Sequence, residues 1–162
     1  MRTRLRYSVA LLLMLALNLN AQTTYYVDAG RSDDDGDGLS WAEAKKYLQS
    51  AIALAADGHE IWVAEGIYYP DEGGNAINDD RNSNFAIPSG VKLYGGFAGD
   101  EESHEDRDWK GNETILSGDI DGSPNDNSGN AHHVVVFEEV SDETILDGFT
   151  ITGGNNDFRQ GG

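Results

Sequence analysis

Short apolar runs alternate with polar segments along most of the chain. The first run, residues 23–27 (TTYYV), is rich in β-branched and aromatic residues and stops at a turn composition, Asp28-Ala29-Gly30. It predicts a first strand. Further runs of strand length cover residues 60–69, 90–97, 114–120, 132–139 and 144–152. The segments 70–84 and 119–130 are rich in Gly, Asn, Asp and Ser, a composition that favours turns and exposed loops.

Residues 39–58 break this pattern and predict one amphipathic helix. Ser40 followed by Glu43 forms a capping box, and Asp57-Gly58 supplies a glycine stop. The apolar positions recur at helical spacing: Trp41, Ala44, Leu48, Ala51, Ile52 and Ala55. A helix with a single apolar stripe must cover another part of the protein.

Two stretches repeat a motif at an interval of 30 residues, TILSGDI at 114–120 and TILDGFTITGG at 144–154. Thr, Ile, Leu and Gly recur at matching positions. A looser form is GVKLYGGF at 90–97, in which Leu93 precedes Gly95 as Leu146 precedes Gly148. Self-similarity at such intervals is typical of repeat architectures.

The strand-length runs predict an all-β fold, a right-handed parallel β-helix (solenoid), with helix 39–58 capping its first coil. In a parallel stack, every strand needs apolar residues on its inward face. The alternations expected to point inward are Ile61/Val63, Val91/Leu93, Val134/Val136 and Ile145/Phe149/Ile151. A β-sandwich also has short strands, but it favours a more regular spacing of the runs.

The first residues predict a secretory signal peptide rather than part of the fold. Arg2, Arg4 and Arg6 precede an unbroken apolar run at 9–17 and a polar end that includes Ala21. The run is too short to span a bilayer. We therefore expect a signal peptide at 1–21, export to the medium or the cell surface, and no transmembrane segment in the mature chain.

The remaining domain organisation follows from the same pattern. Residues 22–58 are expected to hold the first strand and the capping helix, and residues 59–162 the first coils of the β-helix. Because the chain ends soon after a predicted inward strand, we expect a fragment of a longer protein, truncated at its C-terminus.

The charge of the chain restricts its partners, and its cysteine content restricts how it is stabilised. The formal net charge is −18, and loss of residues 1–21 would remove three arginines and make it more negative. Such a field repels nucleic acid and favours divalent cations or basic surfaces. The chain has no cysteine, so no disulfide stabilises it in an oxidising compartment.

Two Asp-rich loops are candidate calcium sites. Asp33, Asp35 and Asp37, followed by Gly38, have the spacing that opens a calcium loop, in which alternate carboxylates converge on a hard cation. The loop is not an EF-hand, because Ala44 stands where the bidentate Glu is required. The second candidate comprises Asp119, Asp121 and Asp126. The alternative for both loops is a solvated turn.

No catalytic motif is found in the sequence. The basic residues Arg81, Lys92, Arg107, Lys110 and Arg159 are scattered among acidic ones without an evident pairing. Neighbouring side chains of a strand point to opposite faces, so His132 and His133 cannot easily bind one ion. We expect them at a strand edge.

Five stretches carry a family resemblance: YYVDAGRSDDDGDGLSWAEAKKYLQSAI, EIWVAEGIYYP, GVKLYGGFAGDE, RDWKGNETILSGDI and ILDGFTITGGN. They resemble the N-terminal region of secreted bacterial proteins with right-handed parallel β-helix repeats, of the pectin-lyase-like fold, many of them adhesin-like surface proteins. The resemblance implies a structural, adhesive or glycan-binding role without catalysis in this segment, with a polysaccharide or another cell-surface component as partner. The alternative is the N-terminal cap of a polysaccharide lyase or glycoside hydrolase whose catalytic coils lie beyond residue 162.

Overall fold

The structure is a computed structural model that describes residues 22–156 except 124, 138 and 140. The predicted signal peptide and Arg159 lie outside these residues. The described chain contains short strands, one α-helix and two 3-10 helices. In chain order they are β1 (Thr24–Val27), η1 (Trp41–Glu43), α1 (Leu48–Leu54), β2 (Glu60–Ala64), β3 (Gly66–Tyr68), β4 (Phe85–Ile87), β5 (Lys92–Phe97), η2 (His104–Asp106), β6 (Thr114–Ser117), β7 (Val135–Phe137), β8 (Ile145–Asp147) and β9 (Phe149–Thr152).

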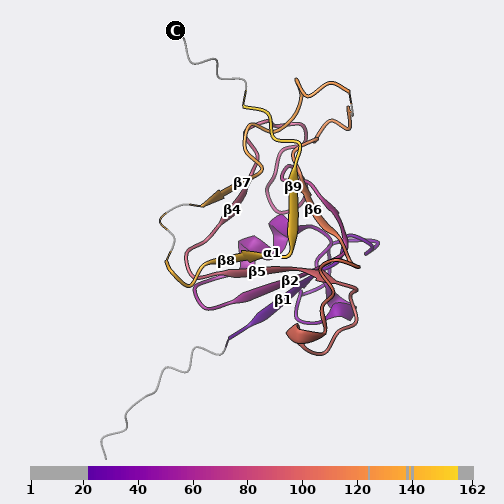
Figure 1. The fold of residues 1–162 in the computed structure, drawn as a ribbon, viewed down its shortest axis with the longest axis vertical. Helices are drawn as coiled ribbons and strands as arrows, with labels where there is room; N and C mark the ends of the chain where they lie inside the picture. The colour runs from indigo at the N-terminus through magenta and orange to yellow at the C-terminus, as the bar shows by residue number, and fades with distance from the viewer. Residues whose placement is uncertain (1–21, 124, 138, 140, 157–162) are drawn as a thin grey trace, which may run out of the picture.

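The strands form three sheets in which every pair is parallel. Their orders are β1-β2-β5-β8, β3-β6-β9 and β4-β7. Figure 1 shows β1, β2, β5 and β8 side by side, with β6 and β9 running at an angle to them. A single residue, Gly148 at φ +82°, turns the chain from β8 into β9 and so from one sheet to the next. Glycine adopts this conformation without the steric penalty of a side chain.

The core lies between the sheets and the helix. Residues of all three sheets form one apolar cluster with α1, in which Ile61, Val63, Leu93 and Leu116 are fully buried. The inward prediction for Ile61/Val63 and Val91/Leu93 is therefore confirmed. Strict alternation along short strands places these apolar side chains on one face, where their burial stabilises the sheets.

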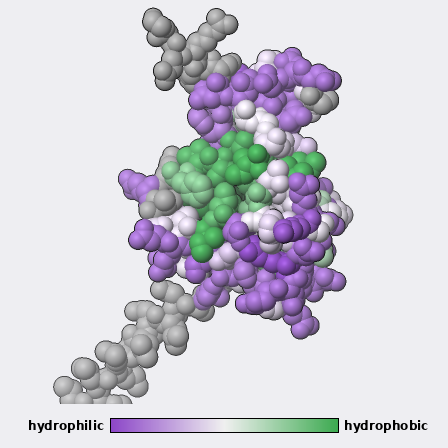
Figure 2. All heavy atoms as spheres, viewed as in Figure 1, coloured by the Kyte–Doolittle hydropathy of each residue, from purple (hydrophilic) through white to green (hydrophobic). Residues whose placement is uncertain are grey.

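The inward prediction fails toward the last strands. Val134 is buried in the core cluster as predicted, but Val136 is half-buried, and in β8 it is Leu146 that packs against the core instead of Ile145. Phe149 packs against the core, whereas Ile151 is 51% exposed. Figure 2 shows apolar residues gathered at the surface on this face, over β7, β8 and β9. Leu146 pairs with the buried Leu93 of β5, so its side chain lies on the same, core-facing side of the sheet.

The predicted helix 39–58 is divided into two. Ser40 caps η1 as expected, its hydroxyl accepting a hydrogen bond from the Glu43 backbone N–H at 3.3 Å. Between η1 and α1 the chain is extended, because Lys45 exchanges backbone hydrogen bonds with the β1 side, to Tyr26 and from Asp28. Pairing with β1 thus competes with the helix at this position.

The predicted fold class is wrong. The described residues form a small α/β-type domain of mostly short parallel strands in three sheets with one helix, and no solenoid repeat is indicated. The physical reason is that helix α1 contributes Leu48, Ala51 and Ile52 to the core cluster itself, so the fold is not all-β.

The two copies of the motif that is repeated at an interval of 30 residues do not occupy structurally equivalent positions. Ile115 and Leu116 lie in β6, which pairs with β9, so that Ile115 faces Thr150. Ile145 and Leu146 lie in β8, in a different sheet. The looser form of the motif at 90–97 does match the register, since Leu93 of β5 pairs with Leu146.

Among the described residues, no helix has the length and apolar character that crossing a membrane requires.

Candidate functional site

The connection between η2 and β6 presents an exposed tryptophan at the surface. Asp108 organises the turn, its Oδ1 accepting hydrogen bonds from the backbone N–H groups of Lys110 at 3.2 Å and Gly111 at 3.0 Å. Its carbonyl oxygen accepts from Asn112 N–H at 2.8 Å. Aspartate commonly fixes turns in this way. The turn leaves Trp109 55% exposed.

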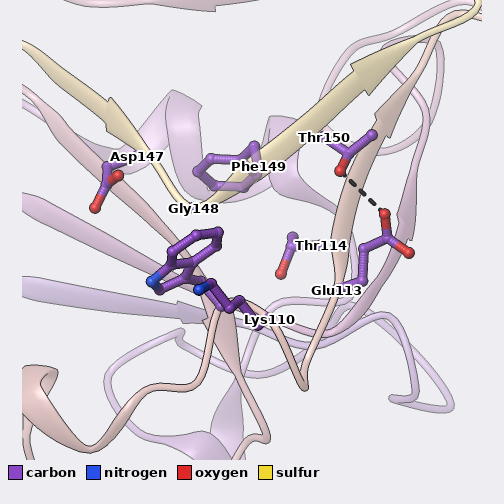
Figure 3. A pocket seen from close by; sticks show the side chains of 8 residues that line it. Lys110, Glu113, Thr114, Asp147, Gly148, Phe149 and Thr150 are labelled. Carbon is purple, nitrogen blue, oxygen red and sulfur yellow. Dashed lines mark hydrogen bonds between the residues drawn. The ribbon is translucent and has the colours of Figure 1, made fainter.

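Trp109 borders a hollow of about 510 Å³, which lies over the junction of two sheets. Its lining residues come from the turn, from β6 and from the β8-β9 corner: Trp109, Lys110, Glu113, Thr114, Asp147, Gly148, Phe149 and Thr150. Figure 3 shows the side chains of Lys110, Glu113, Asp147 and Thr150 around it. We call this hollow the Trp109 pocket. Its volume falls within the range of small-molecule binding sites.

Two glycines allow the sheets to meet beneath the pocket. A Cβ at Gly95 would lie 2.6 Å from the Gly148 carbonyl oxygen, and one at Gly148 would lie 2.5 Å from the Gly95 carbonyl oxygen. Any side chain at either position would force β5 and the β8-β9 corner apart. Glycine inside a strand often marks such a close approach of two backbones.

An ion pair borders the pocket on the β8 side. The Arg107 guanidinium pairs with the Asp147 carboxylate, and its Nη1 also donates to the Gly95 carbonyl oxygen at 3.2 Å. The guanidinium lies 5.2 Å from the ring centroid of Tyr94. Arg107 is 13% exposed and Asp147 is 53% exposed, so the carboxylate remains accessible from the pocket. Burial raises the pKa of the Tyr94 hydroxyl.

The opposite side of the pocket carries a second carboxylate. The Thr150 hydroxyl donates a hydrogen bond to Glu113 Oε1 at 3.0 Å, drawn as the dashed line in Figure 3. Both residues are exposed. Because the carboxylate has further acceptor sites, it can take hydrogen bonds from a ligand while Thr150 holds it.

The Trp109 ring contacts a cation. Lys110 Nζ lies 4.8 Å from the ring centroid, an arrangement that contributes modestly at exposed sites. Trp109 therefore combines an accessible aromatic surface with charged and hydroxyl groups close by. Tryptophan is enriched at binding interfaces because it offers a large contact area with few rotatable bonds.

The first candidate calcium loop is arranged as a series of local turns. Asp33 Oδ1 accepts from Asp35 N–H at 3.2 Å, and Asp37 Oδ1 accepts from Leu39 N–H at 2.8 Å. All three candidate aspartates are exposed. The Ser32 hydroxyl, which donates to Asp33, lowers the pKa of that carboxyl group.

Asp34, which the sequence did not single out, is the residue that connects this loop to the fold. Its Oδ1 accepts from the backbone N–H groups of Lys46 at 2.8 Å and Tyr47 at 3.2 Å. Its Oδ2 accepts from the Ser50 hydroxyl at 2.6 Å. The carboxylate thus satisfies backbone donors immediately before α1, as a capping residue would.

The second candidate loop borders another hollow, of about 520 Å³, beside the far ends of β6 and β9. Its lining includes Asp119 and Asp126 but not Asp121. Asp119 and Asp121 both accept from Ser123 N–H, at 3.0 Å and 3.2 Å. Asp126 accepts from Ser128 N–H at 2.9 Å, and this hydrogen bond lowers its pKa. We call this hollow the Asp126 pocket.

Within the described residues, no group of three or more His, Asp or Glu side chains is arranged to hold a metal ion. Neither loop brings its three aspartates together around one point. Calcium binding by these loops stays a prediction from the sequence.

The other residues noted in the sequence have structural roles or lie apart. Arg81 Nε donates to the Asn130 carbonyl oxygen at 2.7 Å. His132 precedes β7 and is half-buried, with its Nδ1 3.2 Å from the Asn155 carbonyl oxygen, whereas His133 is exposed. Lys92 begins β5 away from the Trp109 pocket.

The comparisons with known proteins give no match: no family model, no curated protein and no solved structure matches the chain. The resemblance stated above therefore rests on its sequence stretches alone.

Sequence reasoning missed the pocket because its parts lie far apart in the chain. Arg107 and Asp147 pair across 40 positions, and nothing local indicates this. Two signals were present in the sequence. Gly95-Gly96 within a strand-length run indicates close backbone approach, and Trp109 between Asp108 and Lys110 indicates an aromatic side chain at the surface.

Proposed function

We propose that this chain is a secreted or cell-surface protein that binds polysaccharide at the Trp109 pocket without catalysing a reaction there. The observation that carries the proposal is the exposed Trp109 ring beside hydrogen-bonding residues that line the same hollow. Sugars present both an apolar ring face and many hydroxyl groups. A pocket for them needs an aromatic surface together with polar side chains that fix the orientation of the ligand.

The polar groups at the pocket suit hydroxyl ligands. Glu113 and Asp147 offer acceptors for sugar hydroxyl donors, and Lys110 and Thr150 offer donors for sugar oxygens. Each of the two carboxylates is already oriented by a protein donor, Thr150 for Glu113 and Arg107 for Asp147. Oriented groups lose little conformational freedom on binding, which favours affinity.

The same carboxylates are poor candidates for acid-base catalysis. A general acid is normally created by burial that keeps a carboxyl group protonated. Glu113 is exposed, and Asp147 is both exposed and paired with Arg107. These observations favour binding over hydrolysis at the pocket.

Affinity electrophoresis of the 162-residue chain tests the proposal. The protein is run in native gels that contain cellulose derivatives, xylan or mannan, beside gels without polysaccharide. We expect retardation by at least one of them and its loss in Trp109→Ala. Leu39→Ala is the matched control, because Leu39 is also 55% exposed but lies outside the pocket. Equal retardation of wild type and Trp109→Ala, or none in any gel, would overturn the proposal.

A further inference from the structure

The Trp109 pocket and the Asp126 pocket lie along the same pair of strands. Thr114, Phe149 and Thr150, at the start of β6 and β9, line the first. Ser117, Thr152 and Gly153, at the end of the same strands, line the second. Since β6 and β9 run parallel in register, the two pockets lie at opposite ends of one strand pair.

Both pockets open on the same face of this pair. Thr150 and Thr152 are two residues apart in β9, so their side chains point to the same side, and both are exposed. Leu116, on the core side, is fully buried. One step of two residues along a strand covers about 6.6 Å. The outward surface between the pockets is thus a short strip, bounded by Trp109 at one end and by Asn127 at the other.

The lining of the Asp126 pocket is polar, and the described residues that form it include no Lys or Arg. It consists of Ser117, Asp119, Ser123, Asn125, Asp126, Asn127, Asn130, Thr152 and Gly153. The amide and hydroxyl groups can exchange hydrogen bonds with sugar hydroxyls, since they include both donors and acceptors. Asp119 and Asp126 would repel a negatively charged sugar, and the net charge of the chain, −18, acts in the same sense.

We propose that the outward strip of β6 and β9, from the Trp109 pocket to the Asp126 pocket, binds an internal stretch of a linear, uncharged polysaccharide. This inference rests on the proposed function and adds the ligand class and the path of the chain. Trp109 binds one sugar ring by stacking, and the Asn and Ser side chains of the Asp126 pocket hydrogen-bond sugars farther along. A ligand of one or two rings contacts only one end of the strip.

The test measures affinity against ligand length by isothermal titration calorimetry. The probes are the gluco-, xylo- and manno-oligosaccharides from disaccharide to hexasaccharide, all β-1,4-linked, with oligogalacturonate of matched length as the charged probe. In the wild type we expect the hexasaccharide of at least one neutral series to bind at least tenfold more tightly than the disaccharide. Oligogalacturonate is expected to bind at least tenfold more weakly than the matched neutral ligand.

Thr152→Arg places a long side chain in the Asp126 pocket, at the far end of the strip, and leaves the residues of the Trp109 pocket unchanged. In this variant, we expect the hexasaccharide affinity to fall to that of the disaccharide, while the disaccharide affinity is unchanged. Thermal melts confirm that the variant is folded. If it is not, Asn125→Ala/Asn127→Ala, at the far pocket, is expected to reduce the length dependence by the same mechanism.

The outcomes separate this inference from the proposed function. Binding that depends on Trp109 but is equal for all lengths would overturn the extended strip and leave the pocket. Tight binding of oligogalacturonate would overturn the uncharged ligand class. Absence of binding to every probe, or binding that is unaffected by Trp109→Ala, would overturn both proposals.

Discussion

The backbone of Trp109 lies directly against Gly96 of β5. A Cβ at Gly96 would lie 2.4 Å from the Trp109 Cα and 2.6 Å from its Cβ. Gly96 also has a φ of +94°, in the region that favours glycine. The contact anchors the turn that carries the exposed ring on the central sheet, so the position of Trp109 depends on the absence of a side chain at Gly96.

This contact predicts that Gly96→Ala displaces Trp109. Because the added methyl group clashes with the turn and the backbone is strained, we expect Gly96→Ala to reduce the free energy of unfolding by about 1–3 kcal/mol and to abolish polysaccharide retardation. Gly99→Ala is the matched control. Gly99 has a similar φ of +101°, but the nearest atom to its added Cβ, the Ala64 Cβ, is 3.8 Å away. Equal binding by the two variants would contradict the anchoring role of Gly96.

Alanine substitutions at the adjacent residues Asp34 and Asp35 are expected to differ in their effect on the free energy of unfolding. Asp34→Ala leaves the N–H groups of Lys46 and Tyr47 and the Ser50 hydroxyl without their acceptor, so we expect a loss of about 1–3 kcal/mol. Asp35 is exposed, and Asp35→Ala should change stability by no more than about 0.5 kcal/mol. Urea denaturation of both variants measures the difference. Similar losses in the two variants would contradict the capping role.

Much of the local structure could be predicted from the sequence, because it depends on local rules. The strand-length runs at 23–27, 90–97 and 114–120 contain β1, β5 and β6, and Ser40 caps a helical turn as its spacing indicates. The helix 39–58 was predicted too long because periodicity cannot reveal that Lys45 pairs with β1. Strand β4 was missed, since three residues after a polar loop carry little periodic signal.

The candidate site was harder to predict than the strands. Register decides which side chains meet, and a repeated motif does not determine register. The repeat aligns Ile115 with Ile145 in the sequence, whereas the structure pairs Ile115 with Thr150. The prediction of the fold class was wrong because strand-length runs do not show how strands are arranged. The runs suggested an all-β solenoid, whereas the structure has short parallel strands in three sheets and a helix in the core.

The burial of the Tyr68 hydroxyl predicts how the stability of the protein depends on pH in the alkaline range. Its hydroxyl accepts from Ala29 N–H and donates to the Ala64 carbonyl oxygen, both at 3.1 Å. Burial raises the pKa of this hydroxyl above its ordinary value. Above pH about 10 the unfolded chain loses the proton while the folded chain keeps it, so this contribution to stability is full below that pH and declines above it.

Tyr68→Phe tests this dependence. We expect the variant to lose about 1–3 kcal/mol at neutral pH, because Ala29 N–H loses its acceptor and the Ala64 carbonyl oxygen keeps only the hydrogen bond from the Thr114 hydroxyl among its side-chain donors. Its stability should then fall less steeply than that of the wild type as the pH rises above about 10. Urea denaturation across this range measures both effects, with Tyr47→Phe at a half-buried position as control. Parallel pH profiles for wild type and Tyr68→Phe would contradict the assignment.

The calcium prediction from the sequence is tested by thermal melts followed by circular dichroism. Binding to either Asp-rich loop requires the midpoint to rise by several degrees with CaCl2, but not with NaCl at equal ionic strength, through binding linkage. Asp35→Asn and Asp126→Asn assign a rise to the first or the second loop. An unchanged midpoint would contradict the prediction and leave the aspartates with their observed hydrogen bonds to the turns.

The most direct measurement of the central claim is a two-dimensional 1H-15N NMR titration that follows the three tryptophan indole N–H signals. The Trp41 indole donates to the Glu101 carbonyl oxygen and that of Trp62 to Glu60 Oε2, each at 3.0 Å, whereas Trp109 is exposed at the pocket. Trp109→Phe assigns the third signal. With the neutral hexasaccharides as ligands, we predict that the Trp109 signal shifts in a saturable manner while the signals of Trp41 and Trp62 stay in place. A Trp109 signal that does not move with any of these ligands, or saturable shifts confined to Trp41 and Trp62, would contradict binding at the Trp109 pocket.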